Sequence, residues 1–164
     1  MRGAASTVRR RTVSRLYTSH VSPRTFHIVT ESHRRQQEIV DEFAFLDDWM
    51  LRFQQVIEHG DAMAPMDEAD KTDDRLVRGC QSRVWLDAGA DADTFHVRAD
   101  SESQIVRGLA SLLVRVYDGL PAEEAAAVDL WFPSEIGLAE HLSPNRANGL
   151  DAMQRAIATA AQAG

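Results

Sequence analysis

Cys80 is the only cysteine in this chain of 164 residues, and it lies in the segment Arg78-Gly79-Cys80-Gln81-Ser82-Arg83. One thiol cannot close an internal disulfide, and it cannot supply the set of thiolates that an iron–sulfur cluster or a cysteine metal site needs. Two roles remain for Cys80. It is either a small buried hydrophobe or a nucleophile that acts as its thiolate.

The position of Cys80 favours the nucleophile. Gly79 allows a sharp turn or a close backbone approach that a side chain would block. The segments on either side have strand character, so Cys80 is expected on a loop between strands, where reactive groups are often presented. Because a lone cysteine next to the apolar run Val84-Trp85-Leu86 is also typical of inert burial, composition alone leaves both roles open.

The polar neighbours of Cys80 fit a reactive thiol as well. Arg78 and Arg83 are cations close in sequence, and nearby positive charge stabilises a thiolate. Gln81 and Ser82 can donate hydrogen bonds to a sulfur anion.

The elements that must position Cys80 begin with an amphipathic helix. Apolar residues recur at steps of four and three from about Gln36 to His59, and Gly60 can end the helix. The spacing predicts one continuous helix over residues 36–59 with this buried stripe: Ile39, Phe43, Leu46, Met50, Phe53 and Ile57.

A β-hairpin is predicted next, with strands at residues 83–88 and 94–99 around the turn-rich stretch 87–93. A short strand near residues 75–78 would add a third member. Asp100 or Ser101 is expected to cap the following helix, which Gly119 ends.

The C-terminal part, from Pro121 onward, is predicted to be helical. Pro121 opens a further helical turn, and Ser143-Pro144 has the N-cap and first-turn proline of a last helix. The predicted fold class is therefore α+β, with a short antiparallel sheet of about three strands packed by helices.

Charge divides the chain in two. Residues 1–35 hold eight arginines and one acid, whereas residues 36–164 carry a net charge of −14. We expect residues 1–35 to be a basic, disordered extension and residues 36–164 to be the folded domain. The extension also has the composition of a transit peptide, and it would equally fit a start codon assigned too early.

The charge and hydropathy patterns also restrict the class of protein. A body this acidic argues against nucleic acid binding. No apolar run approaches the roughly 18 residues that a membrane-spanning helix needs. A cytoplasmic protein is predicted, with an organelle as the alternative if residues 1–35 are a transit peptide.

Several motifs carry a family resemblance. Gly79-Cys80-Gln81-Ser82-Arg83-Val84-Trp85 resembles the GCQSxVW signature of the SufE family, the sulfur-acceptor proteins of iron–sulfur cluster assembly. Residues 100–109 resemble that family's D-S-x-x-x-I-V-x-G-L helix start, and residues 141–150 its H-L-[ST]-P-x-R-x-x-G-L segment. The helix over residues 45–60 resembles the family's first helix. The resemblance covers about residues 39–160.

This resemblance implies a function as well as a SufE/IscU-like α+β fold. A cysteine desulfurase of the SufS or CsdA type, which carries its own pyridoxal phosphate, would be the partner. Cys80 would accept sulfane sulfur as a persulfide and pass it to an iron–sulfur scaffold protein. The chain would then activate a desulfurase without being a stand-alone enzyme, and it would hold no cofactor. The resemblance implies supporting or partner-docking roles for a further set: Gly79, Gln81, Arg83, Asp100, Glu102 and Arg146.

Sulfur transfer makes a further demand on Cys80. A persulfide must be shielded at rest, so apolar neighbours such as Val84 and Leu86 are expected to cover Cys80. The loop is then expected to swing outward when the partner binds.

Three other functions compete for a chain with one thiol. A redox-sensing or peroxide-reactive thiol would usually need a resolving cysteine, and the chain has none. An acidic binding module with an inert Cys80 is the second alternative. A cluster scaffold is excluded because ligation needs several thiolates. The six histidines show no ligand spacing, so no metal site is predicted.

Overall fold

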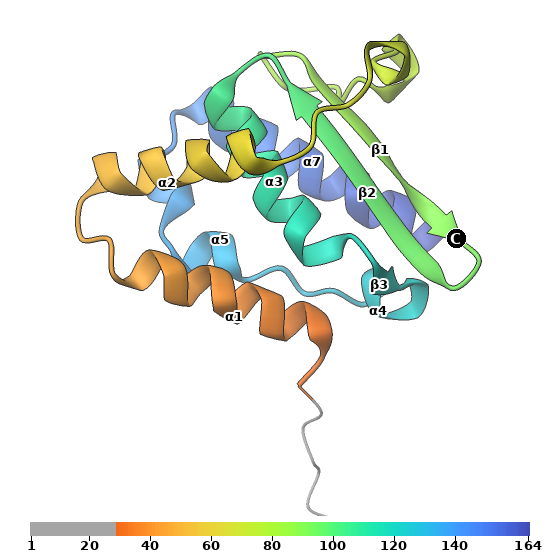
Figure 1. Cartoon of the computed structure of the whole chain (residues 1–164), viewed down its shortest axis with the longest axis horizontal. Helices are drawn as coiled ribbons and strands as arrows, with labels where there is room; N and C mark the ends of the chain where they lie inside the picture. Colours follow the sequence, from red (N-terminus) through yellow and green to blue (C-terminus); the bar gives the residue numbers. More distant parts are fainter. Residues whose placement is uncertain (1–28) are drawn as a thin grey trace, which may run out of the picture.

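The computed structural model describes residues 29–164 (Figure 1). The described chain is α+β, as predicted, with an antiparallel sheet in the order β1-β2-β3. The elements, in chain order, are α1 (Glu31–Ala44), α2 (Trp49–Ala62), the 3-10 turns η1 (Glu68–Asp70) and η2 (Asp73–Arg75), β1 (Val84–Asp91), β2 (Thr94–Ser101), α3 (Gln104–Tyr117), β3 (Leu120–Pro121), α4 (Ala122–Ala126), α5 (Phe132–Glu135), α6 (Leu138–His141) and α7 (Pro144–Ala163).

The single helix predicted over residues 36–59 is wrong, because the chain breaks into α1 and α2. Asp48 takes an extended conformation (φ −100°, ψ 133°) and its carboxylate accepts a hydrogen bond from Met50 N at 2.7 Å, which starts a new helix. Phe45, in the break, is 86% exposed. The apolar periodicity continues across the break and therefore could not predict it. The local signal was Asp48, a residue type that often caps a helix, directly before Trp49.

Helix α1 begins at Glu31, five residues before the expected start of the folded domain. Arg35 donates to the carbonyl oxygens of Arg115, Val116 and Asp118 at the end of α3, the last at 2.7 Å. Residues 31–35 therefore belong to the packed structure. Thr30 caps this helix, and the remainder of the predicted basic extension, apart from Val29, lies outside the described residues.

The hairpin is confirmed, with strands longer than predicted. β1 and β2 pair from Val84 opposite Ser101 to Asp91 opposite Thr94, so most of the expected turn region is strand. The two-residue turn holds Ala92 at a positive φ of 52°. The strand expected near residues 75–78 is reduced to one bridge, between Leu76 and Trp85. The third strand is instead β3, where Leu120 pairs with Phe95.

Helix α3 is the centre of the core. It contacts β2, α2, α1 and α7, and Leu109, Leu113 and Val116 on it are at most 1% exposed. Its N-cap is Ser103, whose hydroxyl accepts from Val106 N at 3.5 Å, and neither Asp100 nor Ser101 takes that position as predicted. In Figure 1, α3 lies between α2 and the hairpin, with α7 behind.

Helix α7 starts at Pro144 with Ser143 as its N-cap, as the sequence predicted. The Ser143 carbonyl accepts from Arg146 N and Ala147 N at 2.9 and 3.0 Å, which fixes the first turn. The helix then runs along β1 (Figure 1). Its N-terminal half consequently lies beside the loop that carries Cys80.

Candidate functional site

Cys80 lies on the loop between the Leu76 bridge and β1, and it is half-buried. Gly79 has a φ of +96°, a conformation that glycine adopts readily and other residues rarely do. This glycine turns the chain so that Cys80 Sγ points at α7, where it lies 3.6 Å from the Gly149 carbonyl oxygen. The structure thus places Cys80 on a loop, as predicted.

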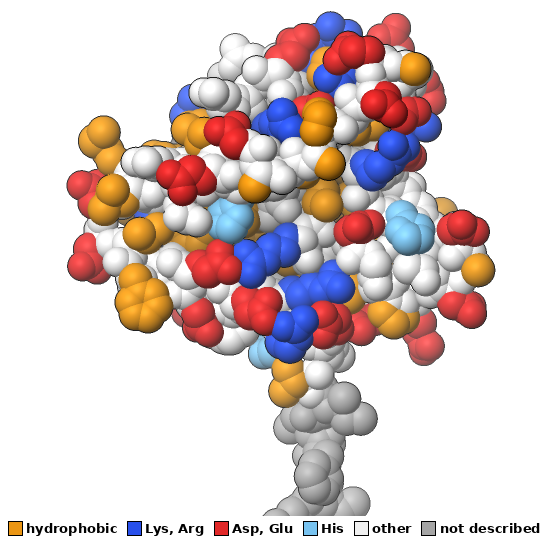
Figure 2. All heavy atoms as spheres, viewed as in Figure 1, with side chains coloured by type: hydrophobic (Ala, Val, Ile, Leu, Met, Phe, Trp, Pro, Cys, Tyr) orange, Lys and Arg blue, Asp and Glu red, His pale blue; other side chains and the backbone are white. Residues whose placement is uncertain are grey.

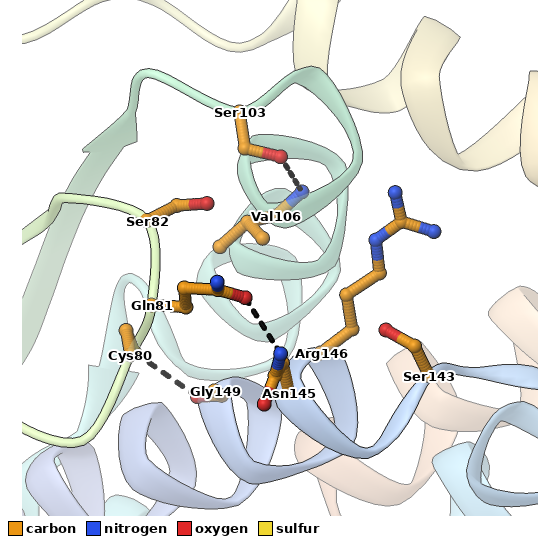
Figure 3. A pocket seen from close by; sticks show the side chains of 9 residues that line it. All are labelled: Cys80, Gln81, Ser82, Ser103, Val106, Ser143, Asn145, Arg146 and Gly149. Carbon is orange, nitrogen blue, oxygen red and sulfur yellow. Dashed lines mark hydrogen bonds between the residues drawn. The ribbon is translucent and has the colours of Figure 1, made fainter.

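A cavity of about 300 Å³ opens beside Cys80 (Figure 3). Its walls come from three elements: the Cys80 loop, the start of α3 and the start of α7. The lining is mainly polar, with three hydroxyl groups, two amides and one guanidinium. The residues are Cys80, Gln81, Ser82, Ser103, Val106, Ser143, Asn145, Arg146 and Gly149.

The thiol is less acidic than its sequence neighbours predicted. Burial raises the pKa of the Cys80 thiol. Arg83 does not offset this, because its guanidinium pairs with Glu102 at 3.3 Å and lies 4.8 Å from the centre of the Trp85 ring. At rest the fold therefore favours the neutral thiol, the less nucleophilic form.

The predicted hydrogen bonds to sulfur also differ from the structure. Within residues 29–164, the one hydrogen bond of Cys80 Sγ is the bond to Gly149, and Gln81 bonds Asn145 instead. Val84 and Leu86 do not line the cavity, but Cys80 and Leu86 both pack against the buried apolar cluster that contains Val84. A Cβ atom added at Gly149 would lie 3.5 Å from Sγ, so the backbone of α7 covers the sulfur.

The other predicted site residues fall into three groups. Gln81 and Arg146 line the cavity and Gly79 directly precedes Cys80, whereas Arg83 and Glu102 form an exposed ion pair and do not line it. Arg146 has no ion-pair partner within the described residues. Asp100 differs from all of these because it is only 3% exposed.

Asp100 is buried and makes its contacts within the chain. Its carboxylate accepts from Met66 N at 3.2 Å and from Ser101 N at 2.8 Å, and it lies 3.1 Å from Lys71 Nζ. Arg107 Nε is 3.5 Å away. Asp100 therefore fastens the segment after α2 to the end of β2, immediately before the α3 turn that forms one wall of the cavity.

The charge of Asp100 should be visible in the pH dependence of stability. Burial acts to raise the pKa of Asp100, but hydrogen bonds from Lys71, Ser101 and Met66 outweigh it and hold the pKa below its ordinary 3.8. The stabilisation is therefore present above the ordinary pKa and is lost as pH falls through the lower folded value. We expect Asp100→Asn to destabilise the protein by about 2 kcal/mol at pH 7, with the difference from wild type narrowing below about pH 4. Urea unfolding at stepped pH values measures this.

The matched control is Asp61→Asn, on the exposed surface at the end of α2 and without an ion pair among residues 29–164. It should change stability by less than about 0.5 kcal/mol. If the difference in unfolding free energy between Asp100→Asn and wild type stayed constant down to pH 2, the charge of Asp100 would not be the source of the stabilisation. The size and shape of the side chain would then be responsible.

Sequence reasoning missed Ser103, Asn145 and Gly149 as parts of the site. All three belong to the segments that carry the family motifs, so the signal was present. The motifs do not show that the start of α3 and the start of α7 meet at the Cys80 loop, because that contact forms only in the folded chain.

The surface does not present a continuous basic field on the face drawn in Figure 2, where arginines alternate with acids. Arg115 pairs with Glu42 at 2.6 Å, and Arg98 pairs with Asp87 at 2.5 Å and with Asp70 at 3.0 Å. None of the helices in residues 29–164 combines the length and apolar character required to cross a bilayer. In the same range, no three His, Cys, Asp or Glu side chains gather as a metal site requires.

The fold and site define a class of protein: a small α+β domain that presents a single, half-covered thiol on a glycine-turned loop. Residues 37–161 match the SufE model, described as an Fe-S metabolism associated domain. The chain belongs to the SufE family.

The relatives agree with this assignment. An uncharacterized SufE-like protein of Rhizobium etli is 42% identical over 125 residues, which is 73% of this chain and 84% of the relative. Another from Rhizobium meliloti is 40% identical over 130 residues, covering 76% of this chain and 93% of the relative. The solution structure of a hypothetical protein from Thermus thermophilus is similar in fold, with a TM-score of 0.65 at 21% identity, covering 79% of this chain and 94% of that one.

Proposed function

We propose that Cys80 accepts sulfane sulfur from the persulfide of a cysteine desulfurase and passes it to a protein that assembles iron–sulfur clusters. The observation that carries this proposal is the single thiol of the GCQSRVW segment, held half-covered on a loop in a member of the SufE family. The pyridoxal phosphate of the reaction would belong to the desulfurase, of the SufS or CsdA type, and this chain would need no cofactor.

The chemistry balances without an added oxidant or reductant. The Cys80 thiolate attacks the outer sulfur of the partner's persulfide, so a new S–S bond forms at Cys80 while the S–S bond of the partner breaks. The partner's cysteine sulfur leaves as a thiolate and takes up the proton that Cys80 gave up. The same exchange, with Cys80 persulfide as donor, delivers the sulfur to the next protein.

The resting geometry implies that the loop moves before transfer. Sγ faces the α7 backbone at Gly149, and an in-line attack needs the sulfur to face a second protein. Release of the loop would also remove the burial that raises the Cys80 pKa and would thereby increase the thiolate fraction. Covering the thiol at rest limits stray oxidation, and uncovering it in the complex allows transfer.

The test is to incubate the full chain with a SufS-type desulfurase and cysteine and to measure the intact mass. The protein should gain one sulfur atom, the gain should map to the peptide that contains Cys80, and a reductant should remove it. A protein that stays at its original mass while the desulfurase turns over would refute the proposal.

The same sample separates the two rival functions. A peroxide sensor should form sulfenic acid at Cys80 rapidly in dilute peroxide, which the covered and weakly acidic thiol disfavours. An inert cysteine in a binding module should be alkylated at one slow rate with or without the desulfurase. A sulfur acceptor should instead be alkylated at a different rate once the partner binds.

A further inference from the structure

The Cys80 loop is attached to the rest of the fold by few bonds. Val77 N donates to the Val84 carbonyl oxygen at 2.9 Å, which closes the base of the loop. Between these residues, no backbone–backbone hydrogen bond joins residues 78–82 to another element of the described chain. The loop therefore depends on its side chains to stay against α7.

Two side-chain bonds make that connection, and they differ in strength. Cys80 Sγ donates weakly to the Gly149 carbonyl oxygen across 3.6 Å. Asn145 Nδ2 donates to Gln81 Oε1 at 2.7 Å, a short bond between neutral groups 64 residues apart in sequence (Figure 3). Thiols are poor donors, so the amide pair is the stronger attachment.

Asn145 has the properties of a residue placed for this contact. It is exposed in the first turn of α7, and its side chain makes no other hydrogen bond within the described residues. The first turn of the helix is fixed independently, by the Ser143 carbonyl oxygen and by Pro144. Removing the Asn145 amide should therefore leave α7 intact.

We propose that Asn145 is a positioning residue, a latch whose bond to Gln81 keeps the Cys80 loop closed on α7 and sets how often the thiol becomes accessible. This inference rests on the proposed function only for the reason why access to the Cys80 sulfur is regulated. The bond and its effect on the loop can be tested without a partner. Opening the latch releases Cys80 from the Gly149 carbonyl and turns it toward solvent or a partner.

The first test measures accessibility without any partner. Cys80 in the full chain is alkylated by iodoacetamide at pH 8, and Asn145→Ala should react about 2- to 12-fold faster, the range of one neutral hydrogen bond. Asn148→Ala is the control, because Asn148 is exposed on the same helix and its side chain has no hydrogen bond within residues 29–164. It should react at the wild-type rate, and an Asn145→Ala rate equal to the control would overturn the latch.

A double-mutant cycle excludes a merely structural effect. Gln81→Ala should also accelerate alkylation, and adding Asn145→Ala to it should bring no further increase, because the bond is already absent. The melting temperatures of the single variants should fall by no more than a few degrees, because each variant loses the same single hydrogen bond. Independent, multiplying effects would mean that the two residues act separately, which contradicts the proposal.

The second test concerns sulfur transfer. If the loop is open in the complex, Asn145→Ala should lower the desulfurase concentration that gives half-maximal sulfur loading by the same factor, with the maximal rate unchanged. A change in maximal rate with an unchanged half-saturating concentration would count against the latch. Failure of the alkylation test leaves sulfur acceptance by Cys80 untouched, whereas absence of any sulfur loading in wild type would refute the proposed function and not the latch.

Discussion

Cys80→Ser is expected to lose sulfur uptake completely. A serine hydroxyl cannot form the S–S bond that holds the transferred atom, and the chain contains no second thiol to replace it. After incubation with desulfurase and cysteine, intact-mass measurement should find the variant at its original mass. Any stimulation of desulfurase turnover by wild type should fall to the level of the desulfurase alone, since the partner's persulfide has no acceptor.

The loss should not come from unfolding. The serine hydroxyl can donate to the Gly149 carbonyl that Cys80 Sγ contacts, and the sulfur makes no other hydrogen bond within residues 29–164. We therefore expect the unfolding free energy to change by less than about 1 kcal/mol, measured by urea titration. A stable Cys80→Ser protein that still gained a sulfur atom would be incompatible with Cys80 as the acceptor.

Gly108→Ala should produce the largest loss of stability. Gly60 on α2 and Gly108 on α3 let these two helices cross with their backbones nearly in contact. A Cβ atom on Gly108 would overlap the Val56 carbonyl oxygen and lie 2.7 Å from its carbonyl carbon. Because the obstructing atoms are backbone, the helices must separate. The expected cost is about 3 kcal/mol, or roughly 10 °C in Tm.

Gly89→Ala on β1 is the matched control, since an added Cβ there would meet nothing within 4 Å. Its Tm should stay at or slightly above the wild-type value, because alanine restricts the unfolded chain more than glycine does. Thermal unfolding followed by circular dichroism compares the two variants. Equal Tm values for Gly108→Ala and wild type would show that the α2–α3 contact is looser than the structure has it.

Local patterns were sufficient to predict much of the fold. The alternation of residues 94–99 predicted β2 because its buried residues face the helices and its exposed ones face water. Ser143-Pro144 marked the start of α7 because a cap and a first-turn proline act within one helical turn. The break between α1 and α2 was not predicted, because the apolar stripe serves both helices equally well.

For the site, the sequence determined that Cys80 is the sole thiol, that Gly79 precedes it, and that its segment has the family signature, since these are properties of neighbouring residues. Only the tertiary structure decided the state of the thiol. Arg83 is close to Cys80 in sequence but is held by Glu102 and Trp85, while Gly149 and Asn145, about seventy residues away, cover and fasten the loop. The physical reason is that burial and hydrogen bonding depend on distances in space, which arise only when α3 and α7 pack beside the loop.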